Sequence, residues 1–148
     1  AKWSVIGADI SEKALTVARR NTIKNDVDVR FMQADMLNVD KWELTGGFDL
    51  IVSNPPYISH QERSSMEPQV VDYEPEVALF TEDVLRIYQS LKHIGDRYLK
   101  TNGLIFCELN PLFASQIHRD FNSGSWQAEL ILDLSGKQRF LKAKKVSR

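Results

Sequence analysis

Residues 48–57 read Phe-Asp-Leu-Ile-Val-Ser-Asn-Pro-Pro-Tyr, a short apolar run that ends in a polar, proline-rich tetrapeptide. The apolar run has the length and composition of a buried strand, which places Asn54, Pro55, Pro56 and Tyr57 at the mouth of that strand. Asn54 offers a side-chain oxygen that accepts hydrogen bonds. The two prolines stiffen the backbone and present carbonyl groups without competing N–H donors.

This tetrapeptide suits chemistry on a planar nitrogen, whose lone pair is delocalised. The Asn54 oxygen and the Pro55 carbonyl can accept the two N–H bonds of an NH2 group, while Tyr57 stacks on the planar group that carries it. Such contacts steer the nitrogen towards an electrophilic methyl group. The simpler alternative is a rigid turn after a strand, because consecutive prolines occur in many loops.

Apolar runs alternate with helical patterns along the chain, which predicts a parallel α/β sheet. The expected strands are 3–8, 27–33, 48–53 and 104–109. The expected helices are about 11–25, 82–100 and 111–121. Ser11 can cap the first helix, and Asn102-Gly103 is expected to end the second. Residues 128–134 and 139–143, separated by Ser135-Gly136, predict an antiparallel pair.

Composition indicates one soluble domain or most of one, since 43% of the 148 residues are hydrophobic and 26% are charged. The formal net charge is -1. The basic residues are spread along the chain, so we expect no stable nucleic-acid binding. No long uncharged apolar stretch occurs, so we expect no membrane partner.

Several side chains with possible chemistry are expected to be structural. The three histidines lack metal-ligand spacing, so we expect no metal site. Cys107 lies in an apolar run and is expected to be a small buried thiol. Tyr88 and Tyr98, at helical spacing, are expected in the core or at its boundary.

Asn54-Pro55-Pro56-Tyr57 after a strand resembles motif IV of the S-adenosylmethionine-dependent methyltransferases that modify amino groups. One branch of these enzymes methylates adenine in nucleic acid, and another methylates glutamine in peptide release factors. Residues 71–79, Val-Asp-Tyr-Glu-Pro-Glu-Val-Ala-Leu, resemble the signature of the second branch, the HemK/PrmC glutamine methyltransferases. Residues 108–111 and 135–141 look most like its eukaryotic mitochondrial members, which implies a mitochondrial location, with the cytoplasm as the alternative.

The resemblance covers nearly the whole chain and implies a Rossmann-like methyltransferase sheet, mostly parallel, with a C-terminal antiparallel hairpin. Residues 1–148 would form a partial catalytic domain, from the second strand to the C-terminus. The first strand and its glycine-rich turn have no counterpart before Trp3. Because that strand is central in the family, its absence is expected to leave two strands without a neighbour. We therefore expect this segment alone to bind the cofactor weakly or not at all.

The resemblance also assigns roles to individual residues. Asn54, Pro55, Pro56 and Tyr57 would form the catalytic motif, with Asn54 also near the cofactor. Residues that follow strands are the ones expected to bind S-adenosyl-L-methionine. They are Asp9, Asp35 and Met36. Asp9 would accept hydrogen bonds from ribose hydroxyls, although from local sequence it could equally be a helix-entry aspartate. Asp35 would lie near the adenine amino group, and Met36 would replace a residue that is often aromatic in the family.

The implied activity is methyl transfer from S-adenosyl-L-methionine to the side-chain amide nitrogen of the glutamine in the Gly-Gly-Gln motif of a peptide chain release factor. The enzyme would thus be a protein-(glutamine-N5) methyltransferase, and no strong general base is needed, because the proton can leave after the nitrogen becomes cationic. The loop 58–79, with Glu74-Pro75, either closes over the substrate or is purely structural. Two alternatives stay open: an adenine-N6 or guanine-N2 nucleic-acid methyltransferase, and a non-catalytic relic that binds a partner through an exposed edge.

Overall fold

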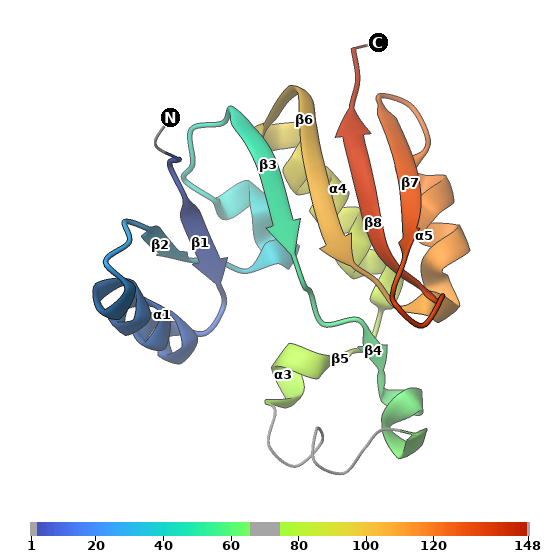
Figure 1. Ribbon diagram of the computed structural model, residues 1–148, viewed down its shortest axis with the longest axis horizontal. Coiled ribbons are helices and arrows are strands. Elements are labelled where there is room, and N and C mark those ends of the chain that lie inside the picture. The colour runs from blue at the N-terminus through green and yellow to red at the C-terminus, as the bar shows by residue number, and fades with distance from the viewer. Residues whose placement is uncertain (1–2, 66–74, 148) are drawn as a thin grey trace. The chain divides into compact units, whose positions relative to one another are not determined.

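The computed structural model describes residues 3–65 and 75–147 and divides the chain into two compact units, residues 1–43 and 44–148. Figure 1 shows the elements of both units, which are described here separately. Among the described residues, no helix combines the length and the apolar character that crossing a membrane requires.

The first unit is a small α/β layer. Its elements are β1 (Ile6–Asp9), α1 (Glu12–Asn25), β2 (Arg30–Gln33) and the 3-10 helix η1 (Met36–Lys41). The strands β1 and β2 pair in parallel. Ser11 caps α1 as predicted, since its hydroxyl accepts a 3.3 Å hydrogen bond from the Ala14 N–H. The buried Leu15 of α1 anchors the helix in this unit.

The second unit is built on a four-stranded sheet in the order β3-β6-β8-β7. These strands are β3 (Phe48–Ser53), β6 (Leu99–Glu108), β8 (Gln138–Lys145) and β7 (Trp126–Leu132). β3 and β6 are parallel, whereas β8 is antiparallel to both β6 and β7. The predicted C-terminal antiparallel pair is therefore confirmed. Among the described strands, β3 pairs only with β6, and β1 of the first unit pairs only with β2.

Two helices cover one face of this sheet, α4 (Val84–Tyr98) and α5 (Ala114–Phe121) (Figure 1). The core lies between them and alternate residues of β6, of which Ile105 and Cys107 are at most 1% exposed. Tyr88 and Tyr98 of α4 are each only 2% exposed. The predicted core positions of both tyrosines and of the Cys107 thiol are thus confirmed.

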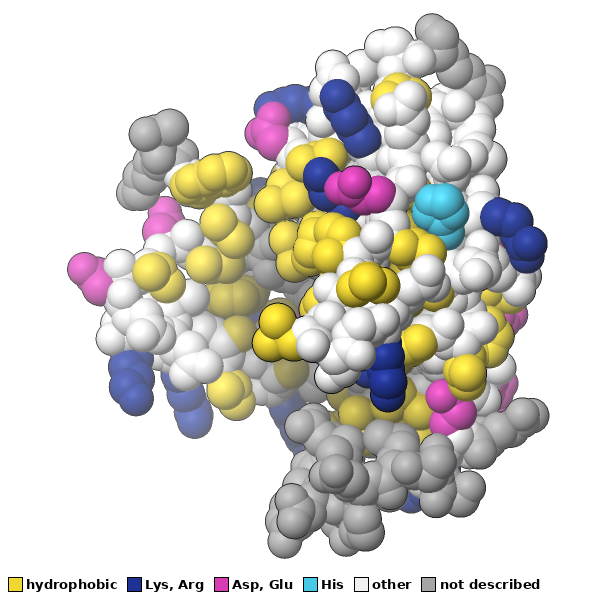
Figure 2. Space-filling view, turned by 45° about the vertical axis from the view of Figure 1, so that its right-hand side comes forward, with side chains coloured by type: hydrophobic (Ala, Val, Ile, Leu, Met, Phe, Trp, Pro, Cys, Tyr) yellow, Lys and Arg dark blue, Asp and Glu magenta, His cyan; other side chains and the backbone are white. Residues whose placement is uncertain are grey.

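Hydrophobic side chains also lie at the surface of the second unit, as the space-filling view indicates (Figure 2). On the face of the sheet opposite the core, Phe106 stacks on Phe140 with ring centroids 5.9 Å apart. Leu50 and Val52 of β3 are 43% and 70% exposed. In this register Val52 pairs with Phe106, so the exposed face continues from β3 onto β6.

The predicted end of the long helix was wrong. α4 ends at Tyr98 and β6 begins at Leu99, so Asn102-Gly103 lies inside the strand. The register explains this, because Phe48 pairs with Leu99 but Leu50 pairs with Leu104, which leaves extra residues on β6. Asn102 lies in this bulge and has a left-handed backbone conformation, φ 67°. A turn signal in the sequence here marks a bulge rather than a helix terminus.

Short elements follow the tetrapeptide. They are β4 (Ile58–Ser59), the 3-10 helix η2 (His60–Ser65), α3 (Glu76–Leu79) and β5 (Phe80–Thr81). β4 and β5 pair in parallel and form a sheet of their own. A further 3-10 turn, η3 (Pro111–Phe113), precedes α5.

Candidate active site

Directly after β3 lie two hydrogen-bond acceptors that no backbone N–H of the described residues occupies. Asn54 is exposed, and its side chain makes no hydrogen bond with any described residue. Pro55 is buried, yet its carbonyl accepts no hydrogen bond from a backbone N–H of the described residues. This is the pair of acceptors that the sequence predicts for a planar NH2 group.

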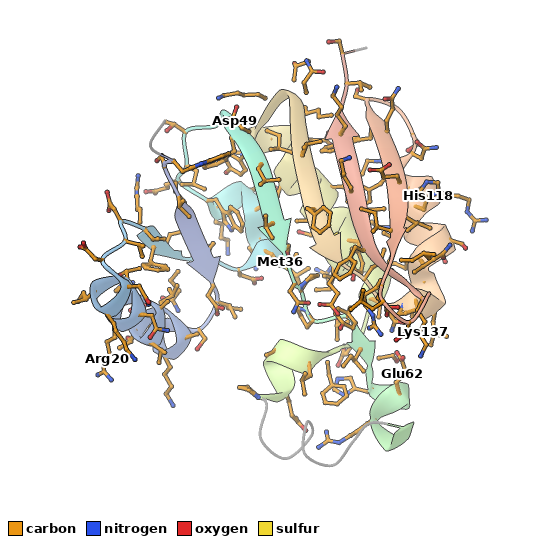
Figure 3. All side chains as sticks on the ribbon, viewed as in Figure 1. Arg20, Met36, Asp49, Glu62, His118 and Lys137 are labelled. Atoms are coloured by element: carbon orange, nitrogen blue, oxygen red, sulfur yellow. The ribbon has the colours of Figure 1, made fainter. Side chains whose placement is uncertain are left out.

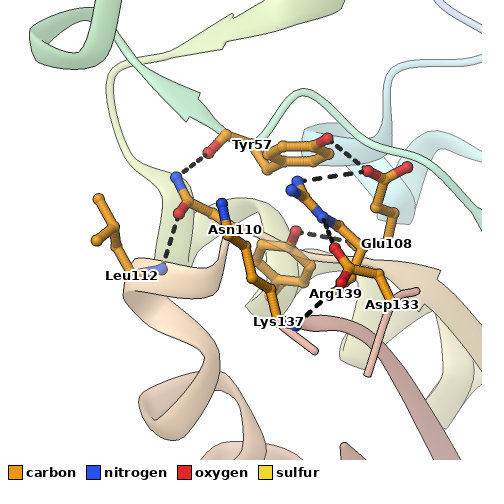
Figure 4. Close-up of polar contacts among 8 residues, drawn as sticks. Tyr57, Glu108, Asn110, Leu112, Asp133, Lys137 and Arg139 are labelled. Atoms are coloured by element: carbon orange, nitrogen blue, oxygen red, sulfur yellow. Dashed lines mark hydrogen bonds and ion pairs between the residues drawn. The ribbon is translucent and has the colours of Figure 1, made fainter. Parts of the chain in front are cut away.

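Tyr57 is half-buried and is held at both ends (Figure 4). Its hydroxyl donates a 2.6 Å hydrogen bond to Oε1 of Glu108, and its carbonyl accepts a 3.0 Å hydrogen bond from Nδ2 of Asn110. Burial, and then the neighbouring Glu108 carboxylate, raise the pKa of Tyr57 to about 12. The phenol therefore stays protonated at neutral pH, so it is a hydrogen-bond donor and not a base.

Asn110 is only 2% exposed and uses its whole side-chain amide. Besides the Tyr57 carbonyl, Nδ2 donates 2.8 Å to Oε2 of Glu62, and Oδ1 accepts from the Leu112 N–H at 2.9 Å. The same Glu62 oxygen accepts from the Ser59 N–H at 3.0 Å. Figure 3 labels Glu62 on the η2 segment. One buried amide thus joins the Tyr57 backbone to Glu62 of η2 and to the backbone of η3.

A row of charged side chains continues from Glu108 into the β7–β8 hairpin (Figure 4). The Arg139 guanidinium lies 3.8 Å from the Glu108 carboxylate and 3.5 Å from that of Asp133. Asp133 also accepts hydrogen bonds from the backbone N–H groups of Lys137 and Ser135. These contacts, led by the Lys137 N–H, hold the pKa of Asp133 below its usual range. Asp133 is thus an anion that orients Arg139 towards Glu108.

The residues predicted to bind the cofactor through its ribose and adenine all lie in the first unit. Asp9 ends β1 and is exposed. Its Oδ1 accepts the Ser11 N–H at 2.7 Å, while Oδ2 accepts no hydrogen bond from a described residue. One carboxylate oxygen is therefore available for a pair of ribose hydroxyls, and Asp9 fits both the helix-entry and the cofactor interpretation.

Asp35 is more fully engaged than Asp9. Its Oδ1 accepts the Leu37 N–H at 2.8 Å and Oδ2 accepts from the Asn38 side chain, so the carboxylate caps η1. Each oxygen has a second lone pair, which a donor such as an adenine amino group could still use. Met36, the first residue of η1, is half-buried. The roles of Asp35 and Met36 towards a cofactor stay predictions.

Within the described ranges, no three His, Cys, Asp or Glu side chains form a group that could hold a metal ion. The part of the chain that carries Tyr73 and Glu74 lies outside the described residues. Pro75 is the N-cap of α3, and Glu76 pairs with Arg63 of η2. The predicted closure of the 58–79 loop over a substrate stays a prediction.

The sequence of this chain matches the family model described as "Methyltransferase domain" over residues 1–140. The chain belongs to this methyltransferase domain family. The match includes β1, η1 and the β3 tetrapeptide, so every predicted site residue of this methyltransferase domain lies inside the matched range.

Several of the curated relatives are release factor glutamine methyltransferases. The one from Bacteroides thetaiotaomicron is 38% identical over 138 residues, which cover 91% of this chain and 49% of the relative. The one from Lactococcus lactis is 36% identical over 145 residues, covering 96% of this chain and 52% of the relative. A bifunctional methyltransferase from Rickettsia typhi is 38% identical over 145 residues, covering 93% and 27%. The chain thus spans about half the length of the release factor methyltransferases that it matches.

Solved methyltransferases share the fold of this domain. TrmN from Thermus thermophilus aligns over 97% of this chain and 36% of its own, with a TM-score of 0.65 and 16% identity. A putative methyltransferase from Streptococcus mutans in complex with SAH aligns over 97% and 76%, with a TM-score of 0.66 and 12% identity. The predicted fold class, a mostly parallel methyltransferase sheet with an antiparallel C-terminal hairpin, is confirmed.

Sequence reasoning missed the residues that hold Tyr57. Glu108 and Asn110 are about fifty residues away from it in the chain, and the resemblance of residues 108–111 to family members gave neither of them a role in the site. A signal was present, because both follow or end the buried strand β6, and β6 is parallel to β3. Residues at the carboxyl ends of neighbouring parallel strands meet at one edge of a sheet.

Proposed function

We propose that this domain is part of an enzyme that transfers a methyl group from S-adenosyl-L-methionine to the side-chain amide nitrogen of a glutamine. The proposed substrate is the Gly-Gly-Gln motif of a peptide chain release factor. The observation that carries the proposal is a pair of acceptors directly after β3, the Asn54 side chain and the Pro55 carbonyl, which accept no hydrogen bond from a backbone N–H of the described residues. The release factor methyltransferases among the relatives support the substrate.

The chain's own residues would contribute by positioning. The acceptor amide would donate its two N–H bonds to Asn54 and Pro55 and lie against the Tyr57 ring, which orients the nitrogen for in-line attack. When bound, S-adenosyl-L-methionine supplies an electrophilic methyl group whose bond to sulfur breaks as the new bond to nitrogen forms. The oxygens of Asn54 and Pro55 would stabilise the positive charge that develops on the amide nitrogen. The released proton can then pass to water, since the Tyr57 phenol, with its raised pKa, already carries a proton at neutral pH and is no base.

The test is methyl transfer to a release factor by the full-length natural protein that contains this chain. The glutamine peptide is read by mass spectrometry, and the expected result is a gain of one methyl group. Asn54→Ala is expected to lower kcat by about 100-fold, because one acceptor of the fixed pair is lost. Asn21→Ala, an exposed change on α1, is the matched control and should leave kcat unchanged.

Offering RNA or DNA as well as the release factor in the same experiment separates this proposal from its alternatives. Methyl incorporation into RNA or DNA instead of the release factor would favour an adenine-N6 or guanine-N2 methyltransferase. No incorporation into either, together with self-association that rises with concentration, would favour the non-catalytic relic.

A mitochondrial location is a further part of the proposal. Its support is the likeness of residues 108–111 and 135–141 to eukaryotic mitochondrial members of the glutamine methyltransferases. Fractionation of cells that express the full-length protein is the direct test, and recovery of the protein outside mitochondria would reject this part alone.

A further inference from the structure

The end of β6 is a rigid support beside the tetrapeptide. The Leu109 side chain is fully buried, and its N–H donates a 2.9 Å hydrogen bond to the Arg139 carbonyl of β8. The Glu108 carbonyl accepts a 2.9 Å hydrogen bond from the Tyr88 hydroxyl of α4. Neighbouring elements on two sides therefore fix the backbone from which the Glu108 side chain projects.

The Glu108 carboxylate has two partners that converge on one oxygen. Oε1 accepts the Tyr57 hydroxyl at 2.6 Å and lies 3.8 Å from the Arg139 guanidinium. Arg139 in turn lies 3.5 Å from Asp133, so its position does not depend on Glu108 alone. The side chains of Glu108, Arg139 and Asp133 are each between 21% and 28% exposed. A carboxylate held in this way can fix the phenol oxygen at one point.

Fixing the phenol oxygen also fixes the axis of the Tyr57 ring, from Cβ to the hydroxyl. The Asn110 amide holds the carbonyl of Tyr57, so the side chain of Tyr57 is anchored to the end of β6 and its backbone to the N-cap of η3. Pro56 lies directly before it and has no N–H with which to bond elsewhere. The geometry of the tetrapeptide is therefore set at its C-terminal end by contacts with Glu108 and Asn110.

We propose that Glu108 is a positioning residue for methyl transfer, which orients the Tyr57 ring against the acceptor amide without touching the reacting atoms. This inference rests on the proposed function for its kinetic test. A purely structural Glu108 would change the stability of the fold, whereas a positioning residue changes kcat in a protein that remains folded.

The kinetic test uses the full-length protein and four variants, with Glu129→Ala as the matched control. Glu129 is an exposed carboxylate of the same sheet that pairs with Lys142. Glu108→Ala is expected to lower kcat about tenfold or more, with the KM for S-adenosylmethionine within about twofold of the original. Glu108→Gln keeps an oxygen that accepts from the phenol and should retain most of kcat. Tyr57→Phe keeps the ring but loses the hydroxyl that donates to Glu108, so its kcat should match that of Glu108→Ala.

The double variant Tyr57→Phe/Glu108→Ala decides whether the two residues act together. If Glu108 works through the phenol, the double variant should be no slower than either single variant, because the same hydrogen bond is lost in each. Multiplied losses in the double variant would overturn the proposal. An unchanged kcat in Glu108→Ala would overturn it as well.

A second readout does not depend on activity. With tyrosine labelled at the ¹³Cζ position, the Tyr57 signal is the one that disappears in Tyr57→Phe. It is expected to shift at neutral pH in Glu108→Ala and to stay in place in Glu129→Ala. If the original protein transfers no methyl group, the proposed function fails while this measurement still tests the contact. A Tyr57 signal unmoved by Glu108→Ala would overturn the positioning role.

Discussion

The hydroxyl of Tyr88 in α4 donates a 2.9 Å hydrogen bond to the backbone carbonyl of Glu108 at the end of β6. Tyr88 is almost fully buried, and this burial raises the pKa of its phenol. Tyr88→Phe keeps the ring and leaves the carbonyl without that donor. We expect the free energy of unfolding to fall by about 1–2 kcal/mol, measured by urea denaturation. An unchanged midpoint would show that this bond adds nothing to stability.

Replacing Gly95 of α4 by alanine is expected to change the free energy of unfolding in the direction opposite to that for an ordinary helical glycine. Gly→Ala in a helix normally stabilises by about 1 kcal/mol. Here a Cβ would lie 2.6 Å from Trp126 and 2.7 Å from Ile105 side-chain atoms. We expect Gly95→Ala to destabilise by about 1–3 kcal/mol through overpacking. Gln89→Ala, at an exposed position of the same helix, is the control and should have little effect in the same urea titration.

Lys145 supports the C-terminal end of α4. Its Nζ donates hydrogen bonds to the carbonyls of Gly95, Asp96 and Leu99. The positive charge of Nζ also interacts favourably with the helix dipole at this end. We expect Lys145→Met to lower the free energy of unfolding by about 2 kcal/mol. Lys144→Met alters the exposed neighbour on the same strand and should change it little. Equal losses in both variants would mean that general charge, and not this contact, is responsible.

The buried Cys107 thiol is expected to lower the free energy of unfolding at alkaline pH. Burial raises the pKa of its thiol from 9.0 to about 12. Above pH 9 the unfolded chain loses this proton while the folded chain keeps it, so the contribution is complete below pH 9 and declines as pH rises towards 12. We expect Cys107→Ala to lose less stability than the original between pH 8 and pH 10. Parallel pH dependences, measured by urea denaturation at both pH values, would contradict this.

Much of the fold follows from local patterns. The run before Asn54 is the strand β3, and Ser11 caps α1 because the signals for both are complete within a few residues. Asn102-Gly103 misled the prediction because its meaning depends on the pairing of β6 with β3, which brings together residues about fifty apart. The short strands β4 and β5 were missed for a different reason, because a strand of two residues has no periodicity in the sequence.

Some residues of the candidate site could likewise be predicted from local sequence and others could not. Asn54 and Pro55 could be named from sequence, because the tetrapeptide carries its own chemistry. Glu108 and Arg139 could not, because a carboxylate and a guanidinium of ordinary surface composition acquire a role only when β6 and β8 bring them to Tyr57. Glu108 does lie at the end of an expected parallel strand, and the convergence of such strand ends is a signal that points to it, beside the resemblance of residues 108–111 to family members.

The two consecutive prolines after Asn54 also determine how this corner of the molecule can be observed. Amide hydrogen exchange and amide-detected NMR record nothing from Pro55 and Pro56, since neither has an N–H. Backbone N–H groups remain only on the flanking Asn54 and Tyr57, whereas the side-chain NH2 of the exposed Asn54 belongs to the same amide as the acceptor oxygen. Ligand titrations that follow only backbone amides would miss the acceptors themselves, so the Asn54 side-chain resonances are the ones to assign first.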